Sequence, residues 1–179
     1  MATNNLKIDS SAPDFSLEGI DGKYSLSSFD DNKALIIIFS CNHCPYVQAY
    51  EGRIKQIQED YRGKGVLVVA INSNEDVNYP DDSFENMKKR AEGQKFNFLY
   101  LRDEDQSVAR AYDATHTPEI FLFDRDRKLA FHGKIDDNWQ EPNKVQNHYL
   151  RNALDELLAG KEISVPETFT IGCTIKWKK

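Results

Sequence analysis

Two short runs of continuous apolar residues, at 34–39 and 66–71, constrain the fold of this 179-residue chain. Both runs are rich in β-branched residues, and both have the length of a strand that is buried on its two faces. Between them, apolar residues recur at steps of three and four from Val47 to Tyr61, which is typical of one face of a helix. A strand, a helix and a strand with tight connections predict a βαβ unit whose two strands are parallel neighbours.

The segments on either side extend this unit into a larger sheet. Residues 15–17 and 24–26 alternate around the turn dipeptide Asp21-Gly22, which predicts an N-terminal hairpin. Downstream, the patterns predict a helix from Asp82, as its cap, to about Gln94, and then a strand at 98–101, a helix at 106–112, a hairpin at 119–123 and 129–132, and a closing helix at 145–158. We therefore expect an α/β fold, a three-layer sandwich whose mixed sheet is parallel in its first half and antiparallel in its second.

Composition excludes several classes of protein. Hydrophobic residues make up 40% and charged residues 29% of the chain, which is ordinary for a globular protein. No apolar run approaches the ~20 residues that span a bilayer, and the N-terminus shows no secretory signal. The net charge of −6 disfavours binding to a phosphate backbone. We expect a cytoplasmic protein with neither a nucleic-acid nor a membrane partner.

The segment Cys41-Asn42-His43-Cys44 follows the first buried strand and opens the next helix. Open α/β sheets place reactive groups at this point, and a helix N-terminus favours a thiolate over a thiol. We assign Cys41 as the nucleophile and Cys44 as the resolving partner, with His43 and Asn42 tuning the pKa of the pair. The alternative for His43 is a polar side chain that only faces solvent.

A second motif lies just before a predicted strand. Proline is unusual directly before a strand, so Thr117-Pro118 indicates a fixed turn, although the sequence cannot tell a cis from a trans peptide bond. His116, two residues before the proline, is a candidate for the mouth of the same site. We interpret His132 and His148 as structural histidines without a catalytic partner.

Three segments together resemble the thioredoxin superfamily, and within it the redoxin or peroxiredoxin-like branch. They are 12–15 (Ala-Pro-Asp-Phe), 39–45 (Phe-Ser-Cys-Asn-His-Cys-Pro) and 117–122 (Thr-Pro-Glu-Ile-Phe-Leu). The resemblance implies one thioredoxin-like domain over 1–179, with a core at 10–160, a redoxin-type insertion between Ile71 and Phe98, and a C-terminal extension at 161–179. It also implies a cis-proline loop opposite the cysteines, in which Thr117 and Pro118 position an incoming disulfide.

The sequence departs from this branch in two respects. Peroxiredoxins carry a threonine three residues before the peroxidatic cysteine and a proline seven before it. The corresponding residues are Ile38 and Ala34 for Cys41, and Cys41 and Ile37 for Cys44. Thioredoxins also bury an aspartate below the second cysteine, whereas no acidic residue occurs between 33 and 50. Peroxide reduction at peroxiredoxin rates is therefore not expected, and the acid that assists resolution is not identified.

The third cysteine, Cys173, lies beyond the closing helix. We interpret it as a small buried residue of a terminal strand, which is common for free cysteine. The alternative is a third redox thiol that folds back towards Cys41.

The leading functional hypothesis is thiol–disulfide exchange without a cofactor. The partners would be a disulfide-containing protein or a small disulfide, and an upstream thiol reductant. One alternative is a thiol peroxidase that uses a Cys41 sulfenic acid. Another is a metal-binding or docking module of thioredoxin fold. A metal site would use Cys41, Cys44 and either a histidine or Cys173, but structural zinc usually takes four ligands and no second cysteine pair is present, so we expect no metal.

Overall fold

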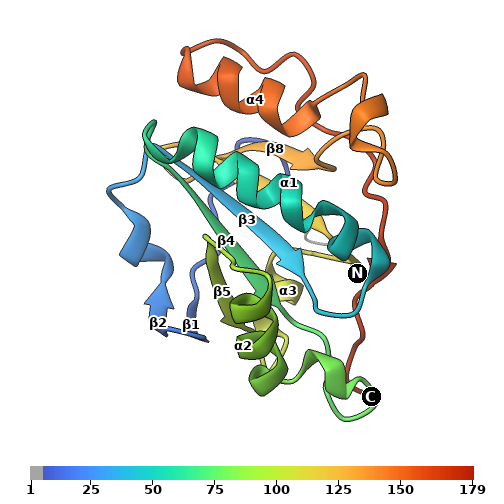
Figure 1. Cartoon of the computed structure of the whole chain (residues 1–179). Coiled ribbons are helices and arrows are strands. Elements are labelled where there is room, and N and C mark those ends of the chain that lie inside the picture. Colours follow the sequence, from blue (N-terminus) through green and yellow to red (C-terminus); the bar gives the residue numbers. More distant parts are fainter. Residues whose placement is uncertain (1–5) are drawn as a thin grey trace.

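The computed structural model describes residues 6–179 and is built around one seven-stranded mixed sheet, in the order β2-β1-β5-β4-β3-β7-β8 (Figure 1). The strands are β1 (Ser16–Gly19), β2 (Gly22–Ser25), β3 (Ala34–Ser40), β4 (Val66–Asn72), β5 (Leu99–Arg102), β7 (Glu119–Phe123) and β8 (Leu129–Gly133). A separate two-stranded sheet pairs β6 (His116–Thr117) with β9 (Cys173–Thr174). The helices are α1 (Pro45–Arg62), α2 (Phe84–Gly93), α3 (Ser107–Ala111) and α4 (Tyr149–Leu158), with short 3₁₀ turns η1 (Leu26–Phe29), η2 (Pro80–Asp82) and η3 (Pro142–Lys144).

The predicted βαβ unit is confirmed. Strands β3 and β4 pair in parallel with α1 between them, and β4 pairs in parallel with β5. The two hairpins are also confirmed, but they lie at opposite edges of the sheet: β1 joins β5 on one side and β7 joins β3 on the other, both antiparallel. The parallel strands therefore form the middle of the sheet rather than one half of it.

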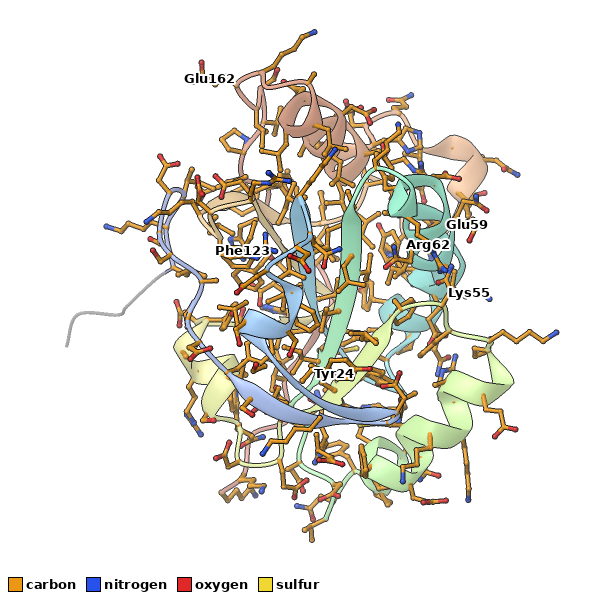
Figure 2. The ribbon with its side chains drawn as sticks, turned by 90° about the vertical axis from the view of Figure 1, so that its left-hand side faces the viewer. Tyr24, Lys55, Glu59, Arg62, Phe123 and Glu162 are labelled. Carbon is orange, nitrogen blue, oxygen red and sulfur yellow. The ribbon has the colours of Figure 1, made fainter. Side chains whose placement is uncertain are left out.

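The two faces of the sheet bury separate apolar cores. Alternate residues of β3 point to opposite sides, so Ile36 and Ile38 belong to one core and Ile37 and Phe39 to the other. Helices α1, α2 and α4 cover the first core, and α3 with the N-terminal segment covers the second. In Figure 2, the charged side chains of Lys55, Glu59 and Arg62 lie along α1 on the side that faces away from the sheet. The expected three-layer sandwich is confirmed.

Some element boundaries differ from the sequence prediction. Strand β5 is displaced by one residue, helix α3 is one residue shorter at each end, and α4 begins at Tyr149 rather than at 145. The cap of α2 is Ser83, whose hydroxyl oxygen accepts a hydrogen bond from the Asn86 N–H at 3.2 Å, so the prediction of Asp82 as the cap is wrong. Asp82 is the last residue of η2, and its carboxylate contacts the cysteine motif instead of capping α2.

Strand β3 lies between β4 and β7 and is buried along its whole length, so its packing should contribute strongly to the stability of the fold. Ile36 is completely buried, so we expect Ile36→Ala to lower the free energy of unfolding by about 2–5 kcal/mol, through lost burial and the cavity left behind. Urea denaturation followed by circular dichroism measures this. Val77→Ala, at a side chain that is 85% exposed, is the control and should change stability by less than about 0.5 kcal/mol. Equal effects of the two substitutions would contradict the central place of β3.

Candidate functional site

The cysteine pair lies between the end of β3 at Ser40 and the first residue of α1, Pro45. Cys44 is the N-cap of α1 and has an extended backbone, with φ −74° and ψ 125°. The expectation that the motif forms the first helical turn is therefore wrong. The physical reason is Pro45, because a residue that precedes proline is disfavoured in the helical region. The helix can begin only after Cys44, which places that residue, and not Cys41, at the amide end of α1.

Three sulfur atoms meet at this point. The Sγ atom of Cys44 lies 2.6 Å from the Sγ atom of Cys173 and 3.5 Å from the main-chain oxygen of Thr117. The Sγ atom of Cys41 lies 3.5 Å from the hydroxyl oxygen of Thr117. Cys41 and Cys44 are 2% and 0% exposed, and Cys173 is half-buried. Cys173 does lie in a terminal strand, β9, as the sequence predicted, but it is only half-buried and its sulfur is a neighbour of Cys44.

The two cysteines of the motif share one proton, and their surroundings decide where it resides. Hydrogen bonds from the Cys41 thiol, the Cys173 thiol and the Val47 N–H, of which the first is the strongest, together lower the pKa of Cys44 to about 4 against the effect of burial. The same bond to Cys44, burial and the negative charge of Asp82 raise the pKa of Cys41, and only the Thr117 hydroxyl opposes them. These surroundings favour the thiolate on Cys44 in the reduced pair, whereas the sequence predicted an ionised Cys41.

Asp82 is a buried acid beside the motif, and the sequence did not place it there. Its carboxylate is completely buried and accepts hydrogen bonds from the main-chain N–H of Asn42 at 2.6 Å, from Asn74 Nδ2 at 3.0 Å and from Asn72 Nδ2 at 3.3 Å. The other carboxylate contact is with Nδ1 of His43. Asp82 belongs to the insertion between β4 and β5, so this insertion fixes the two residues between the cysteines.

Asn42 and His43 are oriented by further contacts. The hydroxyl of Tyr100 donates to Asn42 Oδ1 at 2.7 Å, and Asn42 Nδ2 donates to the main-chain oxygen of Asp81 at 2.7 Å. The imidazole of His43 stacks on Tyr79, with ring centroids 5.6 Å apart, and remains 26% exposed. His43 is thus a partly exposed group joined to a buried carboxylate, which is more than a polar side chain that only faces solvent.

The Thr117–Pro118 peptide bond is cis, and both residues are buried. The main chain of Thr117 is already paired, because β6 and β9 place Thr117 opposite Cys173 and His116 opposite Thr174. His116 is half-buried, and its Nδ1 lies 2.8 Å from the hydroxyl oxygen of Thr115. The edge that the resemblance assigns to an incoming disulfide is thus occupied by the C-terminal segment of the same chain.

Glu119, directly after the proline, ties this loop to the C-terminal segment. Its carboxylate accepts from the main-chain N–H of Thr115 at 2.8 Å and from the hydroxyl of Thr170 at 3.4 Å. It also lies 3.0 Å from Nε2 of His132. His132 therefore has a carboxylate partner, which the spacing along the sequence did not reveal.

A metal ion would find only part of a ligand set here. Among the described residues, Cys41, His43 and Asp82 each offer one ligand atom, and these atoms lie within 4.8 Å of one another. Asp82 and His43 already bind each other, and a structural zinc site takes four ligands. The grouping differs from the sequence expectation, which combined both cysteines of the motif with a histidine or Cys173.

The fold is a three-layer sandwich, and a dithiol at the end of its central strand lies beside a cis-proline loop. This combination defines a thioredoxin-fold redox protein of the redoxin group. More narrowly, the AhpC/TSA family model matches residues 8–132, and the chain belongs to this family.

Two solved structures resemble nearly the whole chain. An uncharacterised conserved protein from Geobacillus kaustophilus is 43% identical, with a TM-score of 0.90, over 98% of this chain and 94% of that one. A hypothetical protein from Sinorhizobium meliloti is 37% identical, with a TM-score of 0.90, over 98% and 97% of the two chains. A putative thiol:disulfide interchange protein DsbE from Chlorobium tepidum shares the fold at 22% identity, with a TM-score of 0.68, over 87% and 98%. A search of curated proteins found no match. In the described residues no helix is long and apolar enough to cross a membrane.

The shared proton predicts how the site titrates. In the reduced protein we expect one thiolate to form at a pH of about 4, because the Cys41 thiol donates to Cys44. Thiolate absorbance in the ultraviolet measures this ionisation. In Cys41→Ala the strongest stabilising hydrogen bond is gone, so the pKa of Cys44 should rise, and in Cys44→Ala the titration near 4 should disappear. If the low titration survives in Cys44→Ala, the thiolate lies elsewhere.

The same ionisation should change stability with pH. Between about 4 and the ordinary thiol value of 9.0, the folded state lacks a proton that the unfolded state keeps on Cys44. Stability contributed by Cys44 therefore rises with pH over this window and is lost as pH falls through the folded-state pKa. The urea midpoint of Cys44→Ala should show a shallower pH dependence in this range than that of the wild-type chain.

Proposed function

We propose that this protein is a thiol–disulfide oxidoreductase that exchanges disulfides through Cys41 and Cys44. The observation that carries the proposal is a pair of buried thiols at the end of β3, whose two sulfurs both lie 3.5 Å from Thr117 of the cis-proline loop. Such a pair can hold one sulfur as a thiolate, the form that attacks disulfides, and a second sulfur within reach to close the ring. Membership of the AhpC/TSA family and the thioredoxin fold support the same chemistry.

Cys41 is the better candidate for the sulfur that meets an outside disulfide. Cys44 is the thiolate at rest, but Cys173, Thr117 and the body of α1 enclose it. The hydrogen bond between the two sulfurs lets the proton of Cys41 pass to Cys44, which leaves a thiolate on Cys41 for the attack. Both sulfurs are buried, so this assignment rests on the contacts of Cys44 with Cys173 and Thr117 and not on exposure or pKa.

The exchange is balanced as follows. The Cys41 thiolate attacks one sulfur of the substrate disulfide, and the other sulfur leaves as a thiolate that takes up a proton. Cys44, after giving up the proton it received, attacks Cys41 in the mixed disulfide, and the second substrate sulfur leaves. The pair is oxidised by two electrons, and the substrate is reduced to two thiols. The partners are then a protein or small disulfide on one side and a thiol reductant on the other, without a cofactor.

The insertion between β4 and β5 could connect the cysteine pair to solvent for proton transfer, and it borders the side on which a substrate would approach. His43 lies next to Cys44 in the chain, binds buried Asp82 and reaches the surface, so it connects the pair to solvent. On the same side, a depression of about 490 Å³ is lined by Asn42 and His43 together with Lys89 and Arg90. Asp81 also lines the depression and Arg90 is paired with Glu51, so the lining does not select a peptide by its net charge.

The alternative of a peroxidase that uses a Cys41 sulfenic acid has weaker support. Peroxide reacts with a thiolate, and the hydrogen bond to Cys44, burial and the charge of Asp82 raise the pKa of Cys41. We expect hydrogen peroxide to oxidise the reduced protein at the slow rate of ordinary thiols in stopped-flow measurements.

Single-thiol variants test which sulfur attacks. The double variant Cys44→Ser with Cys173→Ser keeps only Cys41, and Cys41→Ser with Cys173→Ser keeps only Cys44. With oxidised glutathione as the probe, we expect the Cys41-only protein to form a mixed disulfide at least about tenfold faster, a difference of about 1.4 kcal/mol in activation free energy. Intact-protein mass spectrometry follows the adduct. A faster Cys44-only protein would reverse the assignment.

Insulin reduction is the accompanying activity assay. With dithiothreitol as the reductant, the wild-type chain should accelerate the precipitation of insulin, and Cys41→Ser should return the rate to background. Full activity of Cys41→Ser would overturn the proposed function.

A further inference from the structure

The C-terminal segment, residues 167–178, is held firmly across the candidate site. Figure 1 shows it leaving the region of α4, passing the end of β3 and finishing beside the loop that follows β4. There, the main-chain N–H of Lys176 donates to Asn74 Oδ1 at 2.9 Å, and its oxygen accepts from the Glu75 N–H at 2.8 Å and from Gln106 Nε2 at 2.9 Å. Ile175 is 3% exposed and belongs to the second core. These contacts anchor the chain within three residues of Cys173.

On the other side of Cys173, the segment packs closely on the cis-proline loop. A Cβ atom added at Gly172 would lie 2.1 Å from the main-chain oxygen of Thr117, so only glycine permits this approach. The approach brings β9 into antiparallel pairing with β6, with Cys173 opposite Thr117. The backbone therefore places one particular sulfur at the position beside Cys44.

The distance between the sulfurs is close to that of a bond. A disulfide requires about 2.0 Å, and the Cys44 and Cys173 sulfurs are 2.6 Å apart. We propose that Cys173 is an internal exchange partner of Cys44, which takes over the disulfide from Cys41 and carries it to a less buried position. This inference rests on the proposed function, because the Cys41–Cys44 disulfide is its starting point.

The step is a disulfide isomerisation and needs no further oxidant. The Cys173 thiolate attacks the Cys44 sulfur of the Cys41–Cys44 disulfide, the bond between Cys44 and Cys173 forms, and Cys41 leaves as a thiolate. The proton lost by Cys173 ends on Cys41. One disulfide and one thiol are present before and after the step, so electrons and protons balance.

The position of Cys173 beside Cys44, and not the acidity of the thiols, favours this transfer. Burial and the neighbouring Cys44 raise the pKa of Cys173 to about 11, and burial with Asp82 raises that of Cys41, so either thiol holds the proton when it is the free one. Cys44, with the lowered pKa, stays in the disulfide in both forms. The transfer frees Cys41 on the His43 side and leaves half-buried Cys173 as the sulfur that a thiol reductant reaches first.

The Cys41→Ser variant tests the inference directly, because only Cys44 and Cys173 can then pair. The reduced variant is treated with one equivalent of diamide, alkylated and digested with trypsin. Cys44 lies in the peptide 34–53 and Cys173 in the peptide 162–176, so the disulfide appears as a cross-link between them. We expect this intramolecular cross-link and the loss of both free thiols. Two remaining thiols, or only dimers linked between chains, would overturn the inference.

A second variant separates this result from the proposed function. Cys173→Ser leaves Cys41 and Cys44 as the only pair, and its closure tests the proposed function by itself. If Cys173→Ser closes its disulfide and Cys41→Ser does not, the inference fails and the proposed function stands. If Cys173→Ser does not close and shows no insulin reduction, the proposed function fails. In oxidised wild-type protein we expect the cross-link together with alkylated Cys41, and an alkylated Cys173 alone would contradict the transfer.

Gly172→Ala tests whether the backbone position of Cys173 matters, with Cys44 and Cys173 both retained. The added methyl group must push β9 away from Thr117, so in the Cys41→Ser background the cross-link should form at least about tenfold more slowly. Gly52→Ala is the matched control, because a Cβ atom there meets nothing within 4 Å, and the rate should not change. Equal rates in the two variants would show that the close approach of β9 does not position Cys173.

Discussion

The arrangement around one sulfur atom organises the whole site. Cys44 is the N-cap of α1 because Pro45 allows no earlier start, and its sulfur then faces the amide end of the helix, the thiol of Cys41 and the thiol of Cys173. Stabilising Cys44 as a thiolate forces the shared proton onto Cys41. Pro45 fixes where the helix begins, and the start of the helix decides which cysteine lies at its amide end. The distribution of charge between the two cysteines therefore follows from the backbone.

The insertion between β4 and β5 supplies what the short loop of the motif lacks. A buried carboxylate is costly unless donors surround it, and Asp82 has the main-chain N–H of Asn42, two asparagine side chains and His43 around it. The same negative charge disfavours ionisation of Cys41. Asp82 therefore has two effects: it fixes the residues between the cysteines, and it keeps the outer thiol protonated until the proton moves to Cys44.

The sequence predicted those features that depend on local pattern. The apolar runs at 34–39 and 66–71 and the periodicity of α1 were sufficient for the parallel core, and the position of Cys41 after β3 followed from it. The role of Asp82 could not be predicted, because it depends on how a loop some 40 residues further along folds back, and its place before a helix resembled a cap. Cys173 is 129 residues from Cys44, and only the paired backbone of β6 and β9 brings the two together. The N-cap position of Cys44 could have been predicted from the sequence, since Pro45 alone indicates it.

The cis-proline edge has consequences for the route that a substrate takes. In the resemblance to thioredoxins, the main chain before the proline is free to pair with an incoming disulfide, but here Thr117 pairs with Cys173. A substrate strand and β9 cannot occupy this edge together. Because Lys176, Ile175 and the contact of Thr170 with Glu119 hold β9 on both sides, displacing it would cost several buried contacts. In the proposed function, an outside disulfide would therefore meet the pair from the His43 side, and the cis-proline edge would serve Cys173 of the chain itself.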